Sequence, residues 1–374
     1  MRILHLYKAY PPVKGGIENT VELLAESQAA AGHDVTVLVS ASGWIPRVES
    51  LSGVRVVREP RLLELASTPL SPTLPLRLLT RRPDIAHVHS PFPPAEVANL
   101  LFGRARRTVL TYHSDVVRQR HIMRLYAPVL HAVLRRVDRI FPTSEPYLRR
   151  SPFLRRVADR CQVIPLGVRL EPFGRPDATA AARLRLGWSS DGQLSARPVV
   201  LFVGRLRAYK GLHHLLQAMT GVEANLAIVG DGPERRRLEG LSRRLGIAHR
   251  VHFAGHLADD LLPAAYQAAD AFVLPSHLPS EAFGLVMVEA MASGLPVVCT
   301  ELGTGTSVVV QHGETGLVVP PADPEALARA LQRLLSDDEL RQRFGRAGRT
   351  RARREFSAET YVSRTLDAYE DVLR

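Results

Sequence analysis

The sequence predicts an α/β protein built from two doubly wound domains in tandem, and three observations support this fold class. The chain has 374 residues, more than a single hydrophobic core usually serves. Short apolar segments alternate with helical stretches, which is typical of parallel sheets covered by helices on both faces. The alternation weakens between about residues 168 and 198 and then starts again, as expected where one domain ends and another begins.

The first domain is predicted to occupy residues 1–170. An amphipathic stretch at residues 17–33 predicts a helix that ends at Gly32. Helices between apolar strands imply parallel pairing of those strands. Apolar and β-branched segments predict the strands at residues 2–7, 34–40, 84–90, 108–113 and 139–144.

The second domain is predicted at residues 199–355. Residues 171–198 are rich in Gly, Pro, Ser and Asp, so we assign them to an interdomain connection. The tail at residues 356–374 carries an apolar stripe at helical spacing, which predicts a separate C-terminal helix. The strands of the second domain are predicted at residues 198–204, 225–232, 251–256, 271–276 and 296–300.

The composition is that of a folded, soluble, cytoplasmic protein. The residues are 45% hydrophobic and 23% charged. No apolar run reaches the length of about 18 residues that a membrane-spanning helix needs, and the N-terminus lacks the pattern of a signal peptide. The two cysteines, Cys161 and Cys299, stand far apart, which argues against a disulfide framework and fits a reducing compartment.

Positive charge is concentrated in the first half of the chain. The formal net charge is +12, and residues 101–160 contain 14 arginines and only four acidic residues. Such a region favours an anionic partner, although solvated helix faces in an arginine-rich chain are the alternative. Aromatic residues for base stacking are not interleaved with these arginines. We therefore expect no nucleic acid, and a lipid surface or a phosphorylated substrate instead.

Ligands of doubly wound sheets bind beyond the carboxyl ends of the strands, and the sequence "YPPVKGGIENT" follows the first predicted strand. Gly15 and Gly16 open the next helix, where glycine lets backbone N–H groups approach a negatively charged ligand. A tight turn without a ligand is the alternative. The stretch lacks the G-x-G-x-x-G pattern of dinucleotide-binding proteins.

Two cations follow the first strand of the second domain. Arg205 and Lys210 lie in "GRLRAYKGL", between a strand and a helix, where an arginine clamp and a lysine point charge suit a diphosphate. Ordinary exposed cations are the alternative. The stretch lacks the Gly-Lys-Ser/Thr sequence of a Walker A loop.

The stretch "SEAFGLVMVEAMASGLPVV" places two carboxylates on one predicted helix that begins near Phe283. The N–H groups of Phe283, Gly284 and Leu285 are predicted as free first-turn donors, with Glu281 beside them. Glu289 lies eight residues after Glu281, which is about 12 Å at ~1.5 Å per residue. That separation exceeds the ~5–5.5 Å between the two carboxylates of a retaining glycosidase, so each glutamate is predicted to hold a different part of one ligand.

Histidines also follow strands of the first domain. His113 ends a predicted strand and is a candidate hydrogen-bonding partner for a substrate hydroxyl. His87 and His89 alternate as a metal pair would, but no carboxylate or cysteine stands at ligand spacing. No Asp-x-Asp sequence occurs in the chain. We therefore expect no metal and no cofactor.

Taken together, "PPVKGG", "GRLRAYKGL", "SEAFGLVMVEAMASGLPVV" and "GETGLVVPPADPEALARAL" resemble family 4 of the retaining glycosyltransferases across nearly the whole chain. The resemblance implies the GT-B architecture, in which two Rossmann-like domains face each other across a cleft. It also implies that the C-terminal helix crosses back to the first domain.

The resemblance also implies roles for the motif residues. Arg205 and Lys210 would hold the donor diphosphate and Glu289 the ribose. His113 would contact the sugar near the reaction centre, and Gly16, beside Gly15, would lie near the diphosphate. The donor sugar and its phosphate would be held by Glu281 with the backbone of Phe283, Gly284 and Leu285.

Finer similarities concern the substrates. The segments "TYHSDVVRQR", "EPYLRRSPFL", "VIPLGV" and "ELGTGTS" are similar to bacterial mannosyltransferases of surface-polysaccharide assembly, which implies GDP-mannose as the donor. A UDP-sugar, either UDP-glucose or UDP-N-acetylglucosamine, is the alternative, and sugar-nucleotide epimerisation is a further one. The acceptor would be a saccharide or a lipid-linked hydroxyl at the inner face of the cytoplasmic membrane, with residues 101–160 on the anionic surface. Many relatives have Asp directly after the histidine, where this chain has Ser114 and then Asp115.

Overall fold

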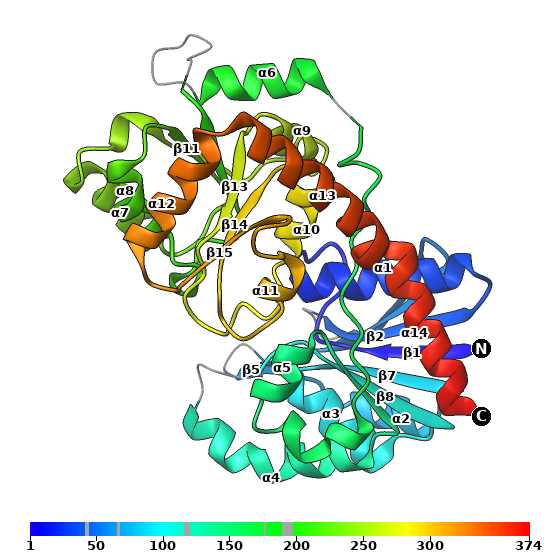
Figure 1. Cartoon of the computed structure of the whole chain (residues 1–374). Coiled ribbons are helices and arrows are strands. Elements are labelled where there is room, and N and C mark those ends of the chain that lie inside the picture. Colours follow the sequence, from blue (N-terminus) through cyan, green and yellow to red (C-terminus); the bar gives the residue numbers. More distant parts are fainter. Residues whose placement is uncertain (42–44, 66–67, 116–119, 176, 189–196) are drawn as a thin grey trace. The chain divides into compact units, whose positions relative to one another are not determined.

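The computed structural model describes residues 1–41, 45–65, 68–115, 120–175, 177–188 and 197–374. These residues form two compact units (Figure 1). The first unit comprises Met1–Gly167 together with Ala358–Arg374, and the second comprises Val168–Ser357. The C-terminal segment therefore belongs to the unit that the N-terminus begins.

The first unit is built on a seven-stranded sheet whose strand order is β3-β4-β2-β1-β7-β8-β9. All neighbouring strands pair in parallel except β3 and β4, which are antiparallel at the edge. The strands are β1 (Arg2–Leu6), β2 (Asp34–Ala41), β3 (Arg47–Leu51), β4 (Val54–Pro60), β7 (Ile85–Ser90), β8 (Arg107–Tyr112) and β9 (Arg139–Pro142).

Helices cover this sheet, and a short antiparallel pair, β5 (Leu63–Leu65) and β6 (Thr68–Leu70), lies apart from it. The red helix α14 (Ala358–Leu373) lies against the blue helix α1 (Gly16–Ala30) and strand β8 (Figure 1). The remaining helices of this unit are α2 (Leu74–Leu79), α3 (Pro93–Phe102), α4 (Arg120–Arg136), α5 (Glu145–Arg150) and the 3-10 helix Leu154–Arg160.

The second unit is built on a six-stranded parallel sheet with strand order β12-β11-β10-β13-β14-β15. Every residue of β10 and of β11 is buried, because helices cover both faces of the sheet. The strands are β10 (Val199–Val203), β11 (Asn225–Val229), β12 (Val251–Gly255), β13 (Ala271–Leu274), β14 (Val297–Thr300) and β15 (Gly316–Val319).

Two helices of the second unit begin at aspartates that cap them. Asp323 and Asp337 accept hydrogen bonds of 2.9 Å from Ala326 N and Leu340 N, so they cap α12 and α13. The helices are α6 (Ala178–Gly187), α7 (Leu212–Ala218), α8 (Arg235–Arg244), α9 (Leu262–Gln267), α10 (Leu285–Ala292), α11 (Thr306–Val309), α12 (Pro324–Leu335) and α13 (Asp338–Phe356). Short 3-10 helices cover Ala208–Lys210, Met219–Gly221 and Ala248–Arg250.

The structure differs from the sequence-based prediction at residues 171–198. The predicted connection contains α6, which packs against α9 of the second unit. Arg185 of α6 binds Asp270 in a 2.9 Å ion pair and donates a 3.0 Å hydrogen bond to the Ala268 carbonyl. The Gly, Pro and Ser residues that flank α6 obscured this short helix in the sequence. Residue 176 and residues 189–196 lie outside the described part of the chain.

Among the described residues, no helix is both long and apolar enough to cross a membrane. The longest, α13, carries charged residues along its length. The apolar side chains instead form the cores of the two units, with the β-strands at their centres.

Candidate functional site

The order of strands in the second sheet reverses direction between β10 and its neighbour β13. The loops after these two strands therefore leave the sheet side by side, at the point where doubly wound sheets bind ligands. The loop after β10 carries Arg205 and Lys210, and the loop after β13 carries Glu281. The fold thus brings together residues that lie about 70 positions apart in the sequence.

Lys210 and Glu281 form a buried ion pair at this point. The Lys210 ammonium donates to Glu281 Oε2, which also accepts a 3.0 Å hydrogen bond from Ser276 Oγ. Only 8% of Lys210 and 7% of Glu281 is exposed. Burial opposes the charge of Lys210, but the Glu281 carboxylate, Tyr209 and the hydrogen bond to Glu281 together outweigh burial and raise the pKa of Lys210 above its ordinary value. Lys210 is therefore a permanent cation held by a fixed anion.

The two loops also touch through their backbones. His277 N donates a 2.9 Å hydrogen bond to the Tyr209 carbonyl. Gly211 has a φ of 71°, and a Cβ atom at this position would lie 1.9 Å from the Pro275 carbonyl oxygen. Only glycine fits such a conformation and such a close approach. The glycine after Lys210 therefore allows the two loops to meet.

A third loop, after β14, closes around the one that carries Glu281. Thr304 Oγ1 donates a 2.8 Å hydrogen bond to the Glu281 carbonyl. Gly305 N donates a 2.7 Å hydrogen bond to the Ala282 carbonyl. Thr304 and Ser276 are fully buried. No sequence pattern marked these hydroxyls: Ser276 lies five residues before Glu281 in the same loop, and Thr304 lies in another loop and donates to the Glu281 backbone carbonyl.

Helix α10, which follows the loop that carries Glu281, begins at Leu285, two residues later than predicted. The residue before it, Gly284, has a φ of 84°, and a Cβ there would lie 2.6 Å from Met287 Cε and 2.9 Å from Leu274 Cδ2. Phe283 lies outside the helix and is buried with its ring 5.8 Å from that of Phe356. The first-turn N–H groups of α10 therefore begin at Leu285, and Phe283 anchors the loop instead.

Glu289 is held separately from Glu281. Its Oε2 accepts a 2.7 Å hydrogen bond from the hydroxyl of Tyr266, which lies on α9. Burial raises the pKa of Glu289 above its ordinary value, against the opposing effect of the Tyr266 hydrogen bond. The two glutamates thus have different partners, which fits separate roles rather than one shared proton.

Arg205 has an exposed side chain in the loop after β10. Lys210, in the same loop, is buried against Glu281. The two side chains predicted to bind a diphosphate therefore differ in burial. Lys210 is fixed in the interior, whereas Arg205 can reorient toward a ligand.

The remaining predicted site residues lie in the first unit. Gly15 precedes α1 and Gly16 is the first residue of this helix. A Cβ at Gly15 would lie 2.4 Å from Glu18 Oε2, whereas a Cβ at Gly16 would meet no atom within 4 Å. Open space beside Gly16 fits the expected approach of a ligand to the start of α1.

His113 lies directly after β8 and is 3% exposed. Burial lowers the pKa of His113 to about 3, so the ring is neutral at physiological pH. Its Nε2 lies 3.2 Å from His89 Nδ1. Asp115, two residues on, accepts hydrogen bonds of 2.7 Å from Tyr112 and 2.9 Å from Ser151, so this carboxylate has structural partners inside the first unit.

Within the described part of the chain, two groups of three histidines have ligand atoms within 4.8 Å of one another, one in each unit. In the first unit these are His5, His87 and His89, whose ring nitrogens all take part in hydrogen bonds. These hydrogen bonds link the three rings to one another and to neighbouring buried side chains. The second group is more exposed and lies beside the loops of the ion pair; its members are His213, His214 and His277.

Comparison with known proteins identifies the family. Residues 14–172 match the model described as Glycosyltransferase Family 4, and residues 190–351 match that described as Glycosyl transferases group 1. The chain is 39% identical over 362 residues to the D-rhamnosyltransferase WbpZ of Pseudomonas aeruginosa, covering 96% of this chain and 93% of that protein. The chain belongs to the family 4 glycosyltransferases.

This glycosyltransferase is also 33% identical over 380 residues to the O-antigen chain mannosyltransferase C of Escherichia coli, covering 100% of this chain and 99% of that protein. Among solved structures it is similar to the sucrose-phosphate synthase of Thermosynechococcus elongatus, with a TM-score of 0.81 and 29% identity over 99% and 98% of the two chains. Anabaena Alr3699/HepE in complex with UDP has a TM-score of 0.80 at 22% identity, over 99% of this chain and 100% of that one. The glycosyltransferase therefore has the GT-B fold that its sequence predicts.

Proposed function

We propose that the protein transfers a hexosyl group from a nucleotide diphosphate sugar to a hydroxyl of a saccharide or lipid-linked acceptor, with retention at the anomeric carbon and without a metal. The observation that carries this proposal is the buried Lys210–Glu281 pair at the reversal of strand order. A fixed cation beside a fixed carboxylate suits a ligand with a diphosphate at one end and sugar hydroxyls at the other.

In this proposal, the site stabilises the departing diphosphate. Lys210 and Arg205 neutralise its negative charge, and the N-terminus of α10 faces it with a positive partial charge. Glu281 accepts hydrogen bonds from the sugar. These groups are fixed before reaction, which lowers the barrier because little reorganisation is needed.

Retention is proposed to follow a front-face route. The bond between the anomeric carbon and the phosphate oxygen breaks as the acceptor oxygen bonds to the same face of that carbon. The acceptor proton moves to the departing phosphate oxygen. No carboxylate nucleophile is required, in keeping with the separate hydrogen-bonding partners of Glu281 and Glu289.

GDP-mannose is the donor that we propose first. A relative named as an O-antigen mannosyltransferase and another named as a GDP-mannose-dependent mannosyltransferase both align over at least 98% of this chain. The relative at 39% identity is a D-rhamnosyltransferase, and this favours a 6-deoxy analogue of mannose as the second candidate. A UDP-sugar is the third.

The donor is tested by incubating the protein with GDP, UDP and ADP and with their sugar forms, and measuring melting temperature. The proposal expects stabilisation by GDP and its mannosyl or D-rhamnosyl form, because a ligand stabilises the state that binds it. Stabilisation by UDP alone would reject a GDP-linked donor. Formation of an epimer from the donor without an acceptor would reject glycosyl transfer in favour of epimerisation.

Replacing Glu289 by alanine is expected to raise the donor KM about tenfold or more and to change kcat little, because the lost contact is to the ribose rather than the reaction centre. The fold should persist, since Tyr266 also donates a 3.3 Å hydrogen bond to the Val286 carbonyl. Steady-state kinetics measure both constants, with Tyr266→Phe as a matched variant that removes the hydrogen bonds of the Tyr266 hydroxyl to Glu289 and to the Val286 carbonyl but keeps the Glu289 carboxylate. A covalent glycosyl-enzyme in Glu289→Ala would contradict the front-face route.

We propose that the arginine-rich region 101–160 holds the protein on the anionic inner face of the cytoplasmic membrane. Arg135 and Arg136, at the end of α4, are exposed, and Leu125 on the same helix is 84% exposed. Residues 116–119 and the side chains of residues 120–124 lie outside the described part of this region. Basic and apolar side chains on one helix suit a charged lipid surface.

The protein is expected to float with liposomes that contain anionic lipid at low salt and to be released as salt rises, because exposed charges are screened. Liposomes of neutral phosphatidylcholine are the control. An Arg135→Glu/Arg136→Glu variant should bind the anionic liposomes at least about thirtyfold more weakly, since it removes two basic residues that contribute ~1 kcal/mol each. Absence of binding by the wild-type protein at low salt would reject the membrane proposal.

A further inference from the structure

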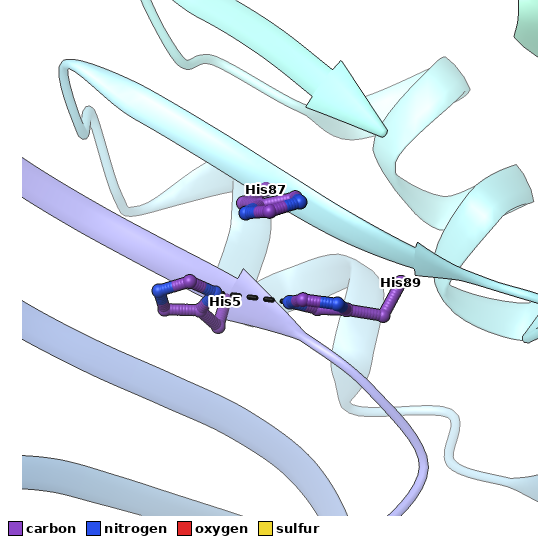
Figure 2. A group of neighbouring side chains, drawn as sticks. All are labelled: His5, His87 and His89. Atoms are coloured by element: carbon purple, nitrogen blue, oxygen red, sulfur yellow. Dashed lines mark hydrogen bonds between the residues drawn. The ribbon is translucent and has the colours of Figure 1, made fainter. Parts of the chain in front are cut away.

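A continuous chain of hydrogen bonds runs through the interior of the first unit and ends at His113. It begins at Gln28 on α1 and continues through His5 on β1 and His89 on β7. Figure 2 shows His5 bonded to His89, with His87 beside them. Gln28, His5 and His89 are completely buried.

Each link joins one defined atom to another. Gln28 Oε1 lies 2.8 Å from His5 Nε2, and His5 Nδ1 lies 3.0 Å from His89 Nε2. His89 Nδ1 then lies 3.2 Å from His113 Nε2. At the end of the chain, His113 Nδ1 is buried without a hydrogen-bond partner among the described residues.

All hydrogen bonds in this series run in the same direction from donor to acceptor. Burial lowers the pKa of His5 to about 4 and that of His89 well below its ordinary value, so the rings are neutral, with one donor and one acceptor nitrogen each. The carbonyl oxygen of Gln28 can only accept, so the proton of His5 is on Nε2. His5 Nδ1 then accepts from His89 Nε2–H, and His89 Nδ1 accepts from His113 Nε2–H.

A second branch holds the Gln28 amide in this orientation. Gln28 Nε2 donates a 3.4 Å hydrogen bond to the hydroxyl of Tyr369 on α14. That hydroxyl lies 2.5 Å from His87 Nδ1, and His87 Nε2 lies 2.7 Å from Thr111 Oγ1. The C-terminal helix thus takes part in fixing the direction of the chain.

We propose that Gln28 is a positioning residue that fixes His113 as the tautomer protonated on Nε2, so that its unpartnered Nδ1 accepts a hydrogen bond from a ligand hydroxyl. Under the proposed function, on which this consequence rests, that hydroxyl belongs to the sugar near the reaction centre. A buried, neutral acceptor discriminates strongly against a ligand that lacks the hydroxyl, because the acceptor nitrogen then stays buried without a hydrogen bond, which is destabilising.

The tautomers are measured directly by two-dimensional NMR of protein labelled with ¹⁵N-histidine, which separates protonated from unprotonated ring nitrogens. The expected result is a proton on Nε2 of His5, His89 and His113. A proton on Nδ1 of His113 in the wild-type protein would overturn the proposal. This measurement does not depend on activity, so it stands even if glycosyl transfer is disproved.

Two variants test the role of Gln28. Gln28→Met keeps the length of the side chain but loses the acceptor, so His113 should become a mixture of tautomers and kcat should fall about tenfold, more than the donor KM changes. Gln28→Glu keeps an acceptor oxygen and should restore Nε2 protonation and most of the activity. An unchanged His113 tautomer in Gln28→Met would reject the proposal.

Thr365→Val is the matched control. Thr365 is a buried polar residue of α14 whose hydroxyl bonds only to the Tyr361 carbonyl, at 2.8 Å. This variant should leave the tautomers and kcat unchanged. If it lowered kcat as much as Gln28→Met does, the effect of Gln28 would be one of general destabilisation, and the positioning role would be rejected.

Discussion

Lys210→Ala is expected to lower kcat for sugar transfer by about a hundredfold or more, which is the scale for removing one fixed charge-stabilising group from an active site. The ammonium is buried and paired with Glu281, so no water molecule or flexible side chain replaces it at low cost. The donor KM should change less than kcat, because the charge of the diphosphate increases as its bond to the sugar breaks. Steady-state kinetics with saturating acceptor measure both constants.

The same variant leaves the Glu281 carboxylate buried with Ser276 as its remaining side-chain partner, so the free energy of unfolding should also fall, by about 3 kcal/mol. Arg185→Ala is the control, because it breaks a half-buried ion pair with Asp270 elsewhere in the same unit. It should lower stability while keeping kcat within about twofold. A kcat for Lys210→Ala close to that of the wild type would refute the role proposed for Lys210.

Gly211→Ala is expected to abolish most activity and to reduce the free energy of unfolding by about 3 kcal/mol or more. A left-handed conformation costs an alanine ~1–2 kcal/mol, and crowding against the Pro275 carbonyl adds ~1–3 kcal/mol. The backbone must move to relieve the contact of 1.9 Å, and this separates the loop of Lys210 from the loop of Glu281. Denaturant unfolding and donor-binding measurements reveal the two effects.

Gly221→Ala is the matched control in the same unit. A Cβ at Gly221 meets no atom within 4 Å, so its effect on the free energy of unfolding should stay within about 0.5 kcal/mol. Equal effects of the two substitutions would mean that loss of glycine flexibility, rather than the close approach of two loops, explains Gly211→Ala.

Most strands of both sheets could be predicted from the sequence, because the signal for a buried strand lies in a short segment. The segment "PVVLFVG" reads as a buried parallel strand without reference to any other residue, and β10 is buried along its whole length. Strands β3, β4 and β15 were not among the predicted strands. The residues of β3 are exposed or half-buried, so this edge strand has no apolar pattern. Helix α6 was missed because the neighbouring residues have the composition of a linker.

Part of the site could be predicted in the same way. Arg205, Lys210 and Glu281 stand directly after predicted strands, and loops after the strands of doubly wound sheets meet at one edge. The family resemblance added that these residues act together. Neither the position of these residues after strands nor the family resemblance predicted that Lys210 is buried and Arg205 exposed. The burial of a side chain depends on which loops pack over it.

By itself, the sequence determined the fold class and the family, because both depend on short segments and their spacing. Only the tertiary structure showed that Ser276 supports Glu281, that Tyr266 supports Glu289, and that Gln28 connects through two histidines to His113. Ser276 shares a loop with Glu281, whereas the other partners come from separate strands, helices and loops. A hydrogen bond depends on distance and direction in space, and neither is written in the order of residues along the chain.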